Sequence, residues 1–163
     1  MKKSTSERPP DIDELAQVPV EQYLTFRLSR VHAKLTQQAS RLLQESAGIS
    51  LVTWRLLVII HKNGPCTFTE ANRDIKMDKG QVSRTVKRMM DDGLLIAEDH
   101  PRDHRQQYLR LSDKGLKVYR KAEPAMLRRR KYLMSMFTAD QFDAFMQGLD
   151  LLDKTAEKTE FPE

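Results

Sequence analysis

The sequence predicts a mainly α-helical protein with one small β-hairpin. Apolar residues recur at spacings of three and four over much of the 163-residue chain, which is the period of an amphipathic helix. Two short segments with helix-start signals follow each other within 67–91. Two stretches with strand character come directly after them, at 94–97 and 107–111. We therefore expect long helices at both ends of the chain and a compact lobe with a hairpin between them.

Charge and hydropathy limit the classes of partner. Lys and Arg number 28 against 23 Asp and Glu, and the resulting net charge of +5 and pI near 9.4 favour nucleic acid or an anionic membrane surface. No run of 18 apolar residues occurs, so membrane insertion is unsupported. DNA, and not a membrane, is the expected partner. The N-terminus lacks the apolar core of a signal peptide, and one cysteine excludes an intramolecular disulfide, so we expect a cytoplasmic protein.

The N-terminal part is predicted to be a flexible extension followed by a dimerisation helix. Residues 1–19 are polar and contain three prolines. Residues 20–48 form a long amphipathic pattern that Gly48 ends. Its apolar surface is wider than one small neighbour would cover. The apolar positions are Val20, Leu24, Leu28, Val31, Leu35, Ala39 and Leu42, widened by Tyr23, Phe26 and Leu43.

The central lobe is predicted to span 49–112. Ser50 is placed to cap a helix that is apolar on most sides and therefore belongs in the core. After a turn at Gly64-Pro65, residues 67–70 read as a capping box that opens a short helix ending near Ile75. A second short helix then begins at Asp78.

This second short helix has one apolar and one cationic face. Val82, Val86 and Met89 fall on one side at about 100° per residue. Between residues 79 and 90 there are four basic residues and no acid. Two short helices joined by a tight turn, the second cationic, form a helix-turn-helix pattern, and the hairpin that follows would be its wing.

The C-terminal part, 113–157, is predicted to hold further dimerisation helices before a tail at 158–163. Ser112 is placed to cap the first, and Pro124 is expected to kink or restart it. Residues 138–141 form a second capping box, with Phe137 and Phe142 spaced as a hydrophobic staple. The apolar seam that follows, Phe142, Phe145, Leu149, Leu152 and Ala156, is typical of a helix that pairs with another.

This order of elements resembles the MarR family of winged-helix transcription regulators over roughly residues 20–155. The most specific segments are 49–57, 82–95 and a wing signature of Asp103-His104-Arg105 followed by 109–115. One departure is Ala71-Asn72, where the family usually has Leu-Ala, and we expect looser packing of that helix.

The resemblance implies a homodimer that binds double-stranded DNA at a palindromic operator, most often as a ligand-responsive repressor. It also implies a small anionic aromatic effector between the dimer helices and the lobe. Candidate lining residues are Tyr23, Arg27, His32, Trp54 and His61, each of which is equally compatible with a core or surface role. No cofactor and no metal are expected.

The DNA-binding candidates divide by chemistry. In the cationic helix, Arg84 offers a fork that matches guanine, and Gln81 suits adenine. The phosphate candidates are Lys79, Ser83, Lys87 and Arg88. In the wing, the resemblance makes Arg105 a minor-groove contact, and Asp103 would brace its guanidinium or the turn. If Asp103 and Arg105 form only a structural pair, the wing would still reach the duplex through Arg102. The alternatives are a solvated helix face and a purely structural Asp103–Arg105 pair.

Other clusters favour plainer interpretations. The basic run 128–131 is read as a solvated face and not as a second DNA contact, with long-range electrostatic steering as the alternative. His100 and His104, with Asp99 and Asp103, lie in a loop where their spacing defines no common face for a metal. Cys66 has no basic neighbour in sequence and is read as a buried small residue rather than a redox sensor.

The sequence is less consistent with two other classes of function. An enzyme is not expected, because the sequence has no Gly-rich phosphate loop, G-x-S-x-G or H-E-x-x-H motif. A winged-helix protein-interaction module without operator binding is the alternative, and a neutral or acidic second helix would favour it.

Overall fold

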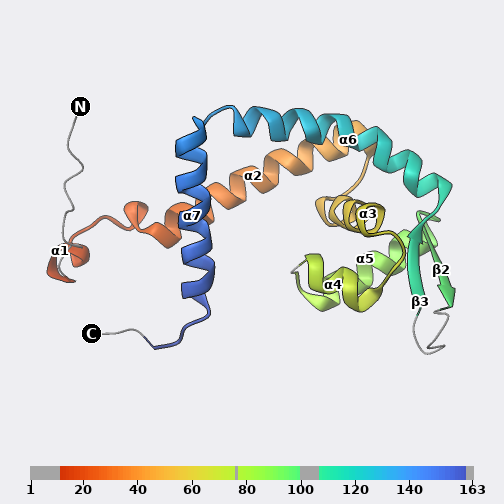
Figure 1. The fold of residues 1–163 in the computed structure, drawn as a ribbon, viewed down its shortest axis with the longest axis horizontal. Helices are drawn as coiled ribbons and strands as arrows, with labels where there is room; N and C mark the ends of the chain where they lie inside the picture. Colours follow the sequence, from red (N-terminus) through yellow and green to blue (C-terminus); the bar gives the residue numbers. More distant parts are fainter. Residues whose placement is uncertain (1–11, 76, 100–106, 161–163) are drawn as a thin grey trace. The chain divides into compact units, whose positions relative to one another are not determined.

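The computed structural model describes residues 12–75, 77–99 and 107–160 (Figure 1). The chain divides into two compact units, with the boundary between Arg41 and Leu42 inside a long helix. Winged-helix architecture is present in the second unit, as the sequence predicts.

The first unit contains α1 (Ile12–Ala16), a 3-10 turn η1 (Val20–Gln22) and most of α2 (Leu24–Ala47). The sequence predicted no regular structure before residue 20 and a helix from Val20, whereas the α-helix begins at Leu24. Tyr23 has an extended backbone, with ψ at 134°, and its N–H bonds to the Val20 carbonyl. This turn separates η1 from α2. The predicted apolar stripe of α2 is largely uncovered in the single chain, with Leu24 56% and Val31 53% exposed.

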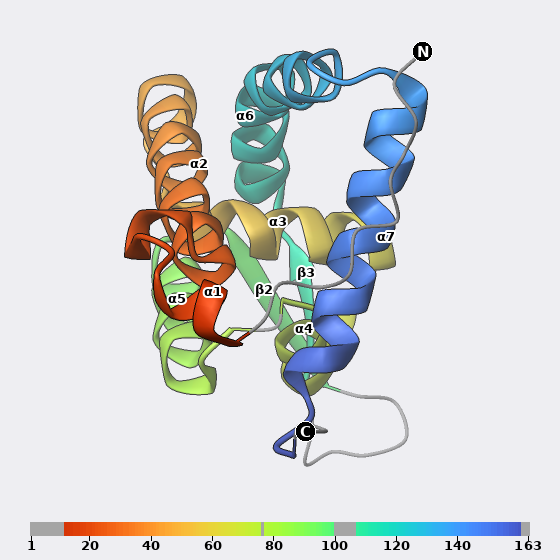
Figure 2. The same ribbon diagram turned by 90° about the vertical axis from the view of Figure 1, so that its left-hand side faces the viewer.

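The core of the second unit is built around α3 (Leu51–Asn63). Ser50 caps it by accepting a hydrogen bond from the Thr53 N–H at 3.1 Å, as predicted. Its buried residues are Trp54, Leu56, Leu57 and Ile60. In both views α3 lies between α6 (Asp113–Met134) on one side and α4 (Phe68–Ile75) on the other (Figures 1 and 2). A helix packed on several sides must be apolar nearly all round, which explains its sequence.

A three-stranded antiparallel sheet closes the lobe in the order β1-β3-β2. The strands are β1 (Cys66–Thr67), β2 (Leu95–Asp99) and β3 (Gln107–Leu111). β3 has the predicted bounds, and β2 is shifted one residue from the predicted start. β1 was not predicted, because a strand of two residues, the second of which caps a helix, shows no alternation. It is defined only by its pairing, with Cys66 opposite Leu109.

The C-terminal helices are α6 and α7 (Ala139–Ala156). Pro124 was predicted to kink or restart this helix; a restart is wrong, since α6 continues through Pro124. Proline removes one N–H donor, and here Pro124 and Arg120 are exposed, so water can satisfy the Arg120 carbonyl. The predicted capping box at Thr138 and Gln141 is present, and Phe137 lies edge-on to Phe142 with 6.2 Å between ring centroids. No residue of α7 is buried.

Among the described residues, no single helix is long and apolar enough to cross a membrane, although the bent pair of α2 and α3 passes the same test of length and composition.

Candidate nucleic-acid interface

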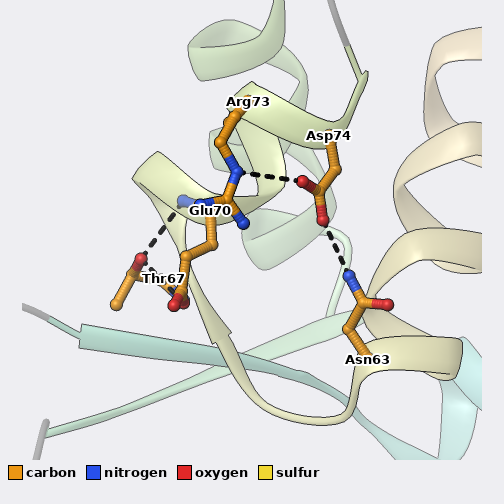
Figure 3. A network of polar contacts seen from close by, with 5 residues as sticks. All are labelled: Asn63, Thr67, Glu70, Arg73 and Asp74. Atoms are coloured by element: carbon orange, nitrogen blue, oxygen red, sulfur yellow. Dashed lines mark hydrogen bonds and ion pairs between the residues drawn. The ribbon is translucent and has the colours of Figure 1, made fainter.

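The first helix of the predicted helix-turn-helix, α4, is held by the expected capping box (Figure 3). The Glu70 N–H donates to Thr67 Oγ1 at 3.2 Å, and the Thr67 N–H donates to Glu70 Oε2 at 2.8 Å. The backbone N–H and the hydroxyl of Thr67 both donate to the Glu70 carboxylate, which lowers its pKa. The N-terminus of α4 is thereby attached to β1.

The C-terminal ends of α3 and α4 are joined by a polar network (Figure 3). Asn63 Nδ2 donates to Asp74 Oδ2 at 2.8 Å, and Arg73 Nε lies 3.2 Å from Asp74 Oδ1. At the position that departs from the family pattern, Ala71 is fully buried. The Asn72 Oδ1 atom is buried without a hydrogen-bond partner in the part of the chain that the structure describes.

The second helix of the motif, α5 (Lys79–Asp91), has the predicted cap and the predicted two faces. Asp78 Oδ1 accepts from the Gln81 N–H at 2.8 Å. Val82, Val86 and Met89 are buried against the core, which directs the opposite face to solvent. All six predicted DNA-binding side chains of this helix are exposed: Lys79, Gln81, Ser83, Arg84, Lys87 and Arg88.

Two local features of this face were missed by the sequence reasoning. A Cβ at Gly80 would lie 3.2 Å from Asp78 Oδ1 and 3.4 Å from an Arg84 guanidinium nitrogen. Gly80 therefore avoids a tight contact with the Asp78 cap, whereas an added Cβ would meet the Arg84 side chain only at van der Waals distance. Arg88 Nε lies 3.8 Å from Asp92 Oδ2. This exposed ion pair partly offsets the positive charge that Arg88 could offer to a partner.

The wing is the hairpin of β2 and β3, in which Ala97 lies opposite the buried Leu109. Arg110 Nε pairs with Glu98 Oε1 across the two strands. The predicted tip residues Arg102, Asp103 and Arg105 lie outside the described residues, as do His100 and His104, so their roles stay predictions. Among the residues that are described, no group of three His, Cys, Asp or Glu side chains is arranged to hold a metal ion.

The predicted effector residues are divided between the two units. Tyr23, Arg27 and His32 lie on the first unit and are exposed. Trp54 and His61 belong to the second unit and both contact Tyr119 of α6, a residue that the sequence reasoning did not single out. The Trp54 ring stacks on Tyr119 with centroids 5.4 Å apart, and the His61 ring lies 4.2 Å from it.

Tyr119 is also tied to its own helix. Its hydroxyl donates to Glu123 Oε1 at 2.5 Å. Burial, followed by the bond to Glu123, raises the pKa of Tyr119 to about 12. A separate cleft of about 280 Å³ lies between α3 and α4, lined by Trp54, Arg55, Val58, Ile59, Asp74 and Ile75.

Cys66 and the basic run have distinct environments. Cys66 is 3% exposed, and burial together with the negative charges of Glu70 and Asp74 raises the pKa of its thiol. A thiol held in its protonated form is a poor nucleophile, which supports the interpretation of a buried small residue.

In the basic run, Arg128 and Arg130 are exposed, whereas Arg129 is half-buried and desolvation lowers the pKa of its guanidinium.

Comparison with known proteins finds a family model and a relative that are similar in sequence to this chain. Residues 47–106 match the sequence model of the MarR family. The repressor IacR of Pseudomonas putida is 30% identical over 115 residues, which cover 71% of this chain and 66% of IacR, so the match spans about two thirds of that protein.

Two solved structures share the fold. Sco3205 of Streptomyces coelicolor, a MarR family regulator in complex with DNA, is 25% identical with a TM-score of 0.74, covering 87% of this chain and 95% of that one. The regulator PcaV of the same organism, in complex with its natural ligand, is 21% identical with a TM-score of 0.70, covering 86% and 98%.

Proposed function

Because this chain belongs to the MarR family of transcriptional regulators, we propose that it is a repressor that binds a palindromic operator as a homodimer and is released by a small ligand. The main support for this proposal is the surface of helix α5. Its apolar side is buried in the lobe, while an exposed front without acids between residues 79 and 90 carries four cations. Such a surface attracts the phosphate backbone and presents side chains of base-reading chemistry.

The role proposed for each DNA-binding side chain follows from its position on α5 or the wing and from its contacts. Arg84 and Gln81 read base edges, since both are exposed in the N-terminal half of α5, the part that enters the major groove. Lys79, Ser83 and Lys87 contact phosphates. Arg88 contributes less, because Asp92 shares its charge. In the wing, Arg105 enters the minor groove with Asp103 bracing it, and Arg102 reaches the backbone.

A homodimer would cover the apolar side chains that the single chain leaves exposed. In α2 these include Leu24, Val31 and Leu35, and α6, α7 and the turn between them add a second set. Solvent-exposed apolar surface of this extent marks an interface. With two-fold symmetry, the two recognition helices would lie about one helical turn of DNA apart. The second set is Leu127, Tyr132, Met134, Met136, Phe137, Phe145, Met146 and Leu151.

The proposed effector is a small anionic aromatic compound. Support comes from the aromatic cluster of Trp54, His61 and Tyr119 in the lobe and from the exposed cation Arg27 with Tyr23 and His32 on the first unit. PcaV, a regulator of the same fold, was crystallised in complex with its natural ligand.

The test is a gel-shift titration with the DNA that flanks the protein's own gene, with scrambled DNA of equal length as the control. We expect a complex that prefers the flanking DNA and weakens steeply as salt rises. Binding that does not distinguish the two DNAs, or no complex at low salt, would refute operator recognition. An unchanged transcript profile in cells carrying Arg84→Glu would favour the protein-interaction module instead.

A further inference from the structure

The recognition helix α5 is held at its two ends by two different helices. At the N-terminal end, an Arg55 guanidinium nitrogen of α3 contacts Met77 Sδ at 3.3 Å, one residue before the cap. At the C-terminal end, Gly93 has φ of 69°, and the Leu94 N–H donates back to the Met89 carbonyl at 2.8 Å. This closure leaves the carbonyls of residues 92 to 94 free to accept bonds from elsewhere.

The N-terminus of α6 supplies those bonds. Lys114 Nζ donates to the Asp92 carbonyl at 2.6 Å, and Ser112 Oγ donates to the Gly93 carbonyl at 2.6 Å. The Ser112 N–H donates to the Leu94 carbonyl at 3.0 Å. We call these three bonds the α5–α6 clasp. Because the ammonium group meets the negative end of the α5 dipole, charge also favours this contact.

Close packing makes the clasp rigid. The Cα of Gly115 lies so near the backbone of residue 94 that an added Cβ would be 2.1 Å from the Leu94 carbonyl oxygen. Ser112 also accepts from the Gly115 N–H at 2.9 Å, so the same hydroxyl caps α6 and binds the end of α5. A movement of the first turn of α6 therefore cannot occur without moving the end of α5 or breaking these bonds.

Resting on the proposed function, we propose that Ser112 and Lys114 are positioning residues for operator binding. Through the clasp they set the orientation of α5, and a displacement of α6 reaches the recognition helix at this point. Neither residue contacts DNA in this assignment. The clasp is also separate from the base-reading end of α5, because Arg84 lies eight residues before Asp92 along the helix.

The test variant is Lys114→Met in the full-length protein, which keeps the chain length and removes the donor. Loss of one hydrogen bond predicts an operator affinity that falls about three- to tenfold. The salt dependence should stay unchanged, because no phosphate contact is lost. Amide hydrogen exchange at Leu94 should become faster than in wild type, since one of the three bonds that anchor this turn is gone.

Two matched variants separate positioning from charge. Lys117→Met removes the same charge from an exposed position of α6 and should leave affinity and exchange as in wild type. Lys114→Arg keeps a donor and should restore affinity. A salt slope reduced by about one unit in Lys114→Met would instead make Lys114 a phosphate contact and overturn the proposal.

Hydrogen exchange keeps the clasp testable apart from operator binding. If wild type forms no specific DNA complex, the proposed function fails, and exchange at Leu94 alone decides the clasp. Faster exchange in Lys114→Met than in Lys117→Met supports it, and equal exchange refutes it.

Discussion

Replacing Gly115 with alanine tests the packing of α6 against the end of the recognition helix. The added Cβ would lie 2.1 Å from the Leu94 carbonyl oxygen, well inside the 3.4 Å at which ordinary van der Waals contact begins. The clashing atom is backbone and accepts the Ser112 N–H at 3.0 Å, so it cannot retreat without weakening that bond. Overpacking of this kind costs about 1–3 kcal/mol.

Two further terms adjust this magnitude. The weakened bond adds about 1 kcal/mol, and the better helix propensity of alanine returns up to about 1 kcal/mol. We therefore expect the free energy of unfolding to fall by about 1–3 kcal/mol, the propensity gain offsetting the lost bond. Gly148→Ala in α7 is the matched control, because nothing in its own chain lies within 4 Å of the added Cβ, and it should be neutral or stabilising.

The assay is urea unfolding followed by circular dichroism at one fixed protomer concentration, since the stability of a dimer depends on concentration. A Gly115→Ala protein as stable as wild type would refute the reasoning, because it would mean that the turn at residue 94 can shift freely.

Three other substitutions give distinct expected outcomes. Arg84→Ala should relax operator specificity by about 1–3 kcal/mol, measured as the ratio of operator to scrambled-DNA affinity, and an unchanged ratio would remove it from base reading. Lys87→Ala should weaken binding to both DNAs and reduce the salt slope by about one unit, whereas an unchanged slope contradicts a phosphate contact. Tyr119→Phe should remove a pH dependence of the free energy of unfolding. The pKa of Tyr119 is raised from 10 in the unfolded chain to about 12 in the folded protein. Wild type therefore has a stabilisation that is present below pH 10 and is lost as the pH rises through 12. Equal slopes of wild type and variant over pH 10–12 would contradict this assignment.

Much of the fold, and the α5 part of the candidate interface, could be predicted from the sequence because the residue patterns that indicate them are local. Asp78, Ser112 and Thr138 cap helices within their own first turns, so three or four neighbouring residues are enough to place each start. The exposed cationic front of α5 follows from the 3.6-residue period in the same way, once Val82 and Val86 are assigned to the core.

The remaining contacts needed partners distant in the chain, and only the tertiary structure decides which of these meet. β1 exists because Cys66 pairs with Leu109, and Tyr119 joins Trp54 and His61 because α6 packs on α3. Residue spacing along the sequence does not predict which residues of distant elements come into contact. Lys114 likewise reads as one more surface lysine, and its contact with a carbonyl 22 residues earlier depends on how the hairpin returns the chain to the end of α5.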